Sequence, residues 1–65
     1  MEVILSQIAK CCILKAINNK YKASGKIFNP YHMSDIKTIT FFNPNIFVDM
    51  QDGQTLNVAI KDAFS

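Results

Sequence analysis

The chain has 65 residues, of which 49% are hydrophobic and 18% are charged, and its formal net charge is +2 at pH 7. A chain of this length buries only about 60% of the surface that its unfolded form exposes, so it builds one small domain, and dinucleotide-binding folds, barrels and two-domain enzymes are excluded. An apolar fraction near one half also excludes intrinsic disorder.

The first predicted element is a helix over residues 7–21. Its expected buried arc consists of apolar side chains that recur at helical spacing: Ile8, Ala9, Cys12, Ile13, Ala16 and Ile17. Ser6 is the predicted N-cap, and Gly25, which follows a lysine-rich turn, is typical of the end of a helix. Residues 2–5 have two interpretations: a short edge strand that enters the helix, or the first turn of the helix itself.

Helical spacing stops before the middle of the chain. Ile27 and Phe28 indicate the start of a short strand. Asn29-Pro30 ends that strand, because proline restricts the backbone of the residue before it. Residues 31–35 are expected to form a loop.

Three runs rich in β-branched and aromatic residues predict an antiparallel meander: 36–42, 46–51 and 54–60. The last run has a second interpretation as a helix with Thr55 as N-cap, since apolar residues also follow helical spacing there: Leu56, Ala59, Ile60, Ala63 and Phe64. The Asp52-Gly53 turn signal favours the strand. The predicted fold is therefore α+β, with a single N-terminal helix packed on a three-stranded antiparallel meander.

The two predicted turns set the register of the sheet. The Asp-Gly pair is a strong signal for a two-residue hairpin turn, which places Asp49 opposite Leu56. Residues 43–45, as a three-residue loop, place Phe41 opposite Phe47. A slip of one residue in either turn would move a strand's side chains to the other face.

In this register one face is almost wholly apolar, with Asp49 as its only charge, and we expect the helix to pack on it: Ile39, Phe41, Phe47, Leu56, Val58 and Ile60. The opposite face also carries large apolar side chains: Phe42, Ile46, Val48 and Met50. Exposed apolar patches mark interaction sites, so these four residues are the predicted protein interface. Val48→Asp is accordingly expected to dissociate a homodimer.

Few residues in the chain suit catalysis or metal binding. His32 is the only histidine, and Cys11 and Cys12 are adjacent, with no recognisable third group or oxyanion hole to complete a nucleophilic site. Spaced ligand pairs for zinc are missing, and Gly25 and Gly53 stand alone rather than in a phosphate-binding loop. We expect no enzyme activity, no metal and no cofactor.

Charge is distributed unevenly along the chain. Residues 1–32 hold five lysines against one glutamate, a balance of +4, whereas residues 33–65 hold two lysines against four aspartates, a balance of −2. A group of lysines around Tyr21 is the candidate contact for an anion or a nucleic acid: Lys15, Lys20, Lys22 and Lys26. The chain has no arginine, which disfavours sequence-specific reading of bases.

The sequence thus predicts a small non-enzymatic binding protein, a regulator or inhibitor that occupies the surface of a host or partner protein and forms a homodimer. Alternatives are a lysine-mediated nucleic-acid-binding protein and a structural subunit of a larger assembly. Ile, Asn and Lys account for 22 of the 65 residues, a bias of AT-rich genomes that fits a phage or viral accessory protein. Adjacent cysteines and the polar residues within the N-terminal apolar run indicate a cytoplasmic protein without membrane contact.

Overall fold

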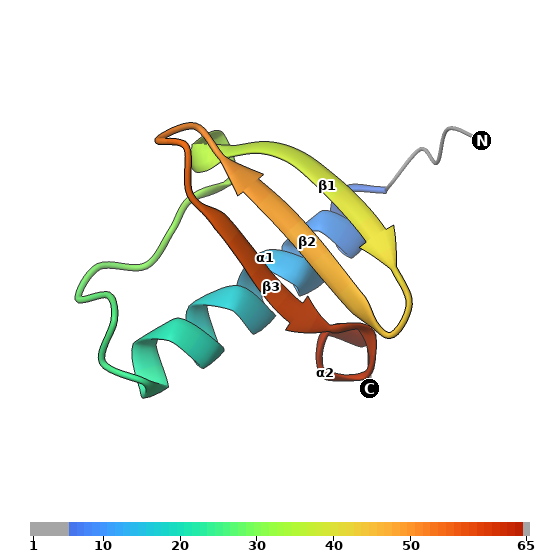
Figure 1. The fold of residues 1–65 in the computed structure, drawn as a ribbon, viewed down its shortest axis with the longest axis horizontal. Helices are drawn as coiled ribbons and strands as arrows, with labels where there is room; N and C mark the ends of the chain where they lie inside the picture. Colours follow the sequence, from blue (N-terminus) through green and yellow to red (C-terminus); the bar gives the residue numbers. More distant parts are fainter. Residues whose placement is uncertain (1–5, 65) are drawn as a thin grey trace.

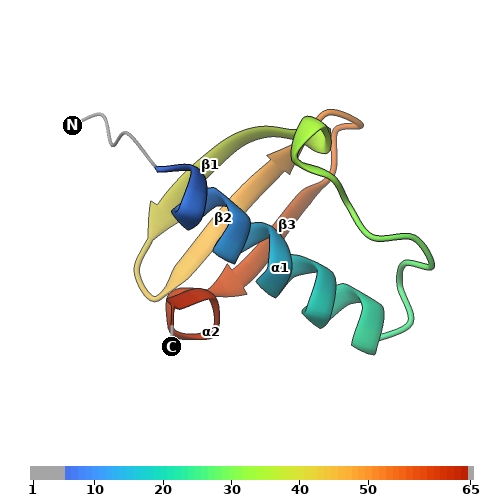
Figure 2. The ribbon, with the colours of Figure 1, turned by 180° about the vertical axis from the view of Figure 1, so that it is seen from behind.

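The computed structural model describes residues 6–64. In chain order its elements are α1 (Gln7–Ala23), η1 (Met33–Asp35), β1 (Ile36–Phe42), β2 (Asn45–Met50), β3 (Thr55–Ala59) and α2 (Ile60–Phe64). The strands form one antiparallel sheet in the order β1-β2-β3, and α1 lies across one face of it (Figures 1 and 2). The predicted α+β fold is confirmed, and both interpretations of residues 2–5, as an edge strand or as the start of the helix, concern positions outside the described residues.

Local signals define both ends of α1. The Ser6 hydroxyl accepts a hydrogen bond from the Ala9 N–H at 3.1 Å, so the predicted N-cap is confirmed. At the other end Gly25 has a φ of +75°, and the Lys26 N–H donates to the Tyr21 carbonyl at 3.0 Å. A left-handed glycine after the last turn is a common helix terminator, because it lets the chain reverse and satisfy the last carbonyls.

The segment between α1 and the sheet is a loop rather than the predicted short strand. Ile27 and Phe28 lie in irregular backbone, and Phe28 is 93% exposed. The loop is held on α1 by Asn18, whose amide donates to the Tyr31 carbonyl at 3.0 Å and accepts from the Tyr31 N–H at 2.7 Å. Side-chain hydrogen bonds thus replace the strand pairing expected here. The loop predicted at 31–35 contains the single turn η1.

The connection between β2 and β3 is one residue longer than the predicted hairpin turn. The Gly53 N–H donates to the Met50 carbonyl at 3.1 Å, and Gly53 has a φ of +92°. A turn followed by a left-handed glycine is a common three-residue connection, in which the Asp-Gly pair takes the last two positions. Asp49 therefore pairs with Thr55 rather than with Leu56.

The connection between β1 and β2 is one residue shorter than predicted. It consists of Asn43 and Pro44, whose peptide bond is cis. Because the connection is one residue shorter, Phe41 pairs with Ile46 rather than with Phe47. Both turns therefore shift β2 by one residue against its neighbours.

This double shift turns β2 over and leaves the faces of β1 and β3 as predicted. Ile46, Val48 and Met50 face α1 and are 0%, 0% and 2% exposed, so their prediction as a surface interface was wrong. Phe47 and Asp49 lie on the open face instead. The physical reason is that successive side chains of a strand point to opposite faces, so a shift of one residue exchanges them all.

The core fills the space between α1 and the sheet. Its buried residues come from α1 and from the inner faces of β2 and β3: Ile13, Ala16, Ile17, Ile46, Val48, Met50, Leu56 and Val58. A bulge in β1 between Ile36 and Thr38 allows both Ile36 and Ile39 to pack against this core, although they are three residues apart.

The buried arc of α1 differs from the predicted arc at its first turn. Ile13 and Ile17 are fully buried, and Tyr21 packs against the same core. Ile8 is 78% exposed, and Cys12 is half-buried. Because the sheet contacts the arc centred on Ile13 and Ile17, Ile8 lies on the opposite, outer side of the helix.

The C-terminal residues combine both interpretations of the sequence. β3 ends at Ala59 and the chain then forms the short helix α2, where the Ile60 N–H donates to the Pro44 carbonyl at 3.0 Å. Phe64 of α2 stacks on Phe41 with a centroid distance of 6.5 Å and an interplanar angle of 22°. Contacts with the β1–β2 hairpin therefore stabilise α2.

Candidate functional site

Exposed aromatic side chains lie at one end of the molecule: Phe41 stacks on Phe64, whereas Phe42, the next residue of β1, points to the open face of the sheet. The side chains of Phe41, Phe42 and Phe64 are 37%, 70% and 44% exposed. They come from the last residues of β1 and from α2, which lie at the same end of the molecule in both views (Figures 1 and 2). Of the four predicted interface residues, Phe42 alone is exposed.

A second apolar surface lies on the outer face of α1. A shallow hollow of about 310 Å³ is lined by Gln7, Ile8, Cys11, Cys12 and Lys15. Ile8 and Cys11 are exposed, and Lys15 forms a cationic rim one turn further along the helix. Sequence reasoning missed this surface, because the apolar character of Ile8 places it in a core arc unless the position of the sheet is known.

The four predicted anion-contacting lysines are not all on one surface. Lys15 and Lys22 are exposed and seven residues apart, a spacing that puts both on the outer face of α1. Lys26 is exposed in the loop that follows Gly25. Lys20 projects to the other side of the helix, where it contacts β3. The structure therefore leaves Lys15 and Lys22 together and separates Lys20 from them.

Lys20 and Tyr21 contact the outer edge of β3 at Asn57. The Lys20 ammonium donates to the Asn57 backbone carbonyl at 2.8 Å and to its side-chain oxygen at 2.7 Å. The Asn57 N–H donates to the Tyr21 hydroxyl at 3.1 Å, and the Lys20 nitrogen lies 5.5 Å from the centre of the Tyr21 ring. These contacts satisfy backbone groups that an edge strand would otherwise present to solvent.

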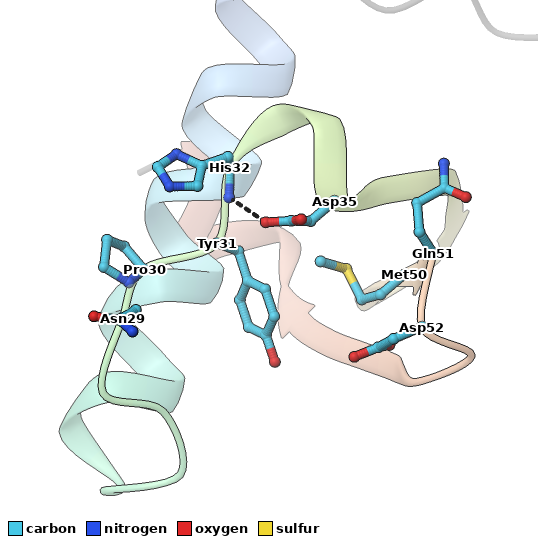
Figure 3. Close-up of a pocket in the computed structure, with 8 residues that line it drawn as sticks. All are labelled: Asn29, Pro30, Tyr31, His32, Asp35, Met50, Gln51 and Asp52. Carbon is cyan, nitrogen blue, oxygen red and sulfur yellow. Dashed lines mark hydrogen bonds between the residues drawn. The ribbon is translucent and has the colours of Figure 1, made fainter.

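A cleft of about 750 Å³ lies between the loop before η1 and the β2–β3 turn (Figure 3). His32 contributes to its wall, but its ring points away from Met50 and Asp52 (Figure 3). The Asp35 carboxylate accepts the His32 backbone N–H at 2.8 Å and thereby holds the first turn of η1. Cys11 and Cys12 line a different hollow, so this cleft does not combine a thiol with the imidazole.

The open face of the sheet carries a polar row across its three strands. Asp49 of β2 accepts hydrogen bonds from the Thr38 hydroxyl at 2.8 Å and from the Thr55 hydroxyl at 2.9 Å. These two hydrogen bonds hold the pKa of Asp49 below its ordinary value, and the bond from Thr38 contributes more than the bond from Thr55. The charge of Lys37 acts in the same direction. The row keeps this part of the open face polar.

Within residues 6–64 no cluster of three or more His, Cys, Asp or Glu side chains is placed to hold a metal ion. In the same part of the chain, neither helix combines the length and the apolar character needed to cross a bilayer. No protein-family model matches the sequence, and no curated protein or solved structure is significantly similar to it.

Proposed function

We propose that this protein is a non-enzymatic regulator or inhibitor that binds a partner protein through the outer face of α1. The observation that carries the proposal is Ile8, which is 78% exposed beside a shallow apolar hollow while the core of the same helix is fully packed. A large aliphatic side chain beside a hollow gains most from contact with another apolar group, since water leaves both surfaces.

The charges around the hollow indicate the chemistry of the partner. Lys15 lies at its rim and Lys22 lies further along the same exposed face. A protein surface with a projecting apolar side chain flanked by carboxylates would complement this arrangement, because opposite charges at the rim steer association. The cognate site is therefore expected to be an acidic surface with an apolar centre.

The proposal extends to the setting in which the protein acts. Self-association is part of it, and a phage or viral accessory protein directed at a host factor is the class that fits a chain rich in Ile, Asn and Lys. Cys11 and Cys12 are free thiols, which suits a reducing compartment such as the cytoplasm.

Affinity capture with three matched baits tests this function. The baits are the full chain, Ile8→Asn on the outer face of α1, and Phe28→Asn in the exposed loop, both of which replace a large exposed apolar side chain. A partner from source-cell extract is identified by mass spectrometry, purified and titrated by calorimetry. Loss of an Ile contact of about 1.5–3 kcal/mol predicts binding at least about tenfold weaker for Ile8→Asn and unchanged binding for Phe28→Asn. Equal affinity for all three baits would exclude the outer face of α1.

A nucleic-acid-binding function is the second candidate, and the shared exposed face of Lys15 and Lys22 supports it. It predicts retention on nucleic acid that falls steeply with salt and is lost in the Lys15→Gln, Lys22→Gln variant. Ile8→Asn would not change this retention. A protein partner instead predicts sensitivity to Ile8→Asn at constant salt, so one set of variants separates the two functions.

A further inference from the structure

The two edges of the sheet differ in how their backbone groups are used. The strand order β1-β2-β3 makes β1 and β3 the edge strands. The N–H and C=O of Asn57 in β3 are bonded to Tyr21 and Lys20 of α1. Side chains of α1 therefore occupy the middle of the β3 edge and hinder its pairing with another chain.

The register identifies the groups that β1 presents at the other edge. Since Asn57 directs its backbone groups away from β2, its partner Phe47 directs its own toward β1, where it pairs with Thr40. Thr40 is thus bonded inward, and the N–H and C=O groups of Ile39 and Phe41 point outward. Among residues 6–64, no backbone or side-chain hydrogen bond reaches these outward groups.

We propose that β1 pairs with β1 of a second copy in antiparallel orientation, so that the two sheets become continuous. This inference rests on the proposed function in one respect: that function includes self-association, and the pairing of β1 supplies its contact. A two-fold axis at Thr40 places Ile39 opposite the partner's Phe41, and Phe41 opposite the partner's Ile39. Each of these pairs exchanges two hydrogen bonds, because the outward groups of both residues face one another.

The residues along β1 suit a second copy better than an unrelated chain. An antiparallel strand is complementary to itself about a two-fold axis, and Thr38–Phe42 contains no charge that would face its own image. On the open face the axis places Phe42, which is 70% exposed, opposite the partner's Thr38. Because Lys20 and Tyr21 occupy the outward groups of Asn57 in the middle of β3, that edge offers no continuous row of groups for pairing, so pairing stops at two copies and does not propagate into a fibre.

The mass of the full chain in solution tests the pairing. Sedimentation over a range of concentrations should show a dimer for the unchanged protein. Thr40→Lys puts two like charges together at the axis and should weaken association at least tenfold, with an unchanged circular dichroism spectrum. Thr55→Lys changes another exposed threonine of the open face, on the protected edge, and should leave the dimer intact. A monomer for the unchanged protein, or a dimer that persists in Thr40→Lys, would overturn the proposal.

Disulfide trapping tests the register. Opposed residues of a non-hydrogen-bonded pair have Cα atoms about 4.5 Å apart, within the range that a disulfide spans. With Cys11 changed to Ser and Cys12 to Ala, Thr40→Cys should give a covalent dimer on mild oxidation. Thr38→Cys should not give a covalent dimer, because an axis at Thr40 leaves the two introduced cysteine side chains several residues apart along the paired strands. The reverse result would contradict the position of the axis.

Amide hydrogen exchange identifies what covers the edge. The amides of Ile39 and Phe41 should be protected in the dimer and exchange rapidly in Thr40→Lys. Protection that persists in a monomer would show that another segment of the same chain covers β1, which overturns the proposal. Whether the Thr40→Lys monomer still binds the purified partner tests separately the proposed partner binding through the outer face of α1. Partner binding and β1 pairing can therefore fail independently of each other.

Discussion

At the scale of single residues, Asp49 shows how one carboxylate connects three strands. Its carboxylate accepts one hydrogen bond from a threonine hydroxyl of β1 and one from a threonine hydroxyl of β3, and both bonds favour the ionised form. Because its pKa is lower in the folded than in the unfolded chain, the carboxylate contributes stability above about pH 4 and loses it as the pH falls through the folded pKa.

This linkage gives a prediction for the threonines. Thr38→Val should raise the pKa of Asp49 more than Thr55→Val does, because the Thr38 hydrogen bond is the larger cause of the shift. Thr40→Val, on the same face but without a hydrogen bond to this carboxylate, is the control and should leave it unchanged. Carboxyl-carbon NMR titration measures all three variants, and a common titration curve would show that the hydroxyls do not tune Asp49.

At the scale of elements, the turns decide which face each strand presents. Gly53 has a φ of +92° in the β2–β3 connection, and no atom beyond its two chain neighbours lies within 4 Å of where a Cβ would be. A side chain there would meet backbone strain rather than a steric clash with neighbours. The length of the connection, and with it the register of β2, therefore depends on a conformation that glycine adopts readily.

Gly53→Ala should lower the free energy of unfolding by about 1–2 kcal/mol, the usual cost of left-handed backbone for a residue with a Cβ. Urea denaturation measures the loss. Gln51→Ala, at an exposed position of the same turn, should stay within about 0.5 kcal/mol of the unchanged protein. Equal effects of the two substitutions would mean that the left-handed conformation is not what the glycine supplies.

The contact between α1 and the edge of β3 gives a second prediction at this scale. Tyr21→Phe removes the hydroxyl that accepts the part-buried Asn57 N–H at 3.1 Å and should cost about 1 kcal/mol. The Asn57 amide should then exchange faster with solvent. Tyr31→Phe removes only an exposed contact of 3.4 Å to Gln54 and should cost less. An unchanged exchange rate at Asn57 would show that the hydroxyl does not protect this edge.

At the scale of the whole molecule, stability depends on one small core between α1 and the sheet. Val48 is fully buried in it, so Val48→Asp places a carboxylate where no partner is available. A chain of 65 residues has only about 3–10 kcal/mol of stability, which such a burial removes. We expect circular dichroism to show an unfolded chain at 25 °C, not the dissociated folded subunits predicted from the sequence. A folded Val48→Asp monomer would contradict this core.

Sequence signals were sufficient where structure depends on neighbours along the chain. Helical spacing, the Ser6 cap and the glycine at position 25 located α1, and β-branched runs located the three strands. Each of these features depends on interactions within a few residues. The α+β class followed from their order.

Only the tertiary structure decided which side chains of these elements are buried. Both registers of β2 place apolar residues on each face, and the choice depends on a difference of one residue in each turn. The charge of Asp49 on the predicted inner face was the one sequence signal against that register. Ile8 follows the helical pattern of a core residue, yet the sheet contacts the other side of α1. Burial depends on how separate elements pack against one another. The packing of α1 on the sheet therefore decided that Val48 belongs to the core and Ile8 to the surface.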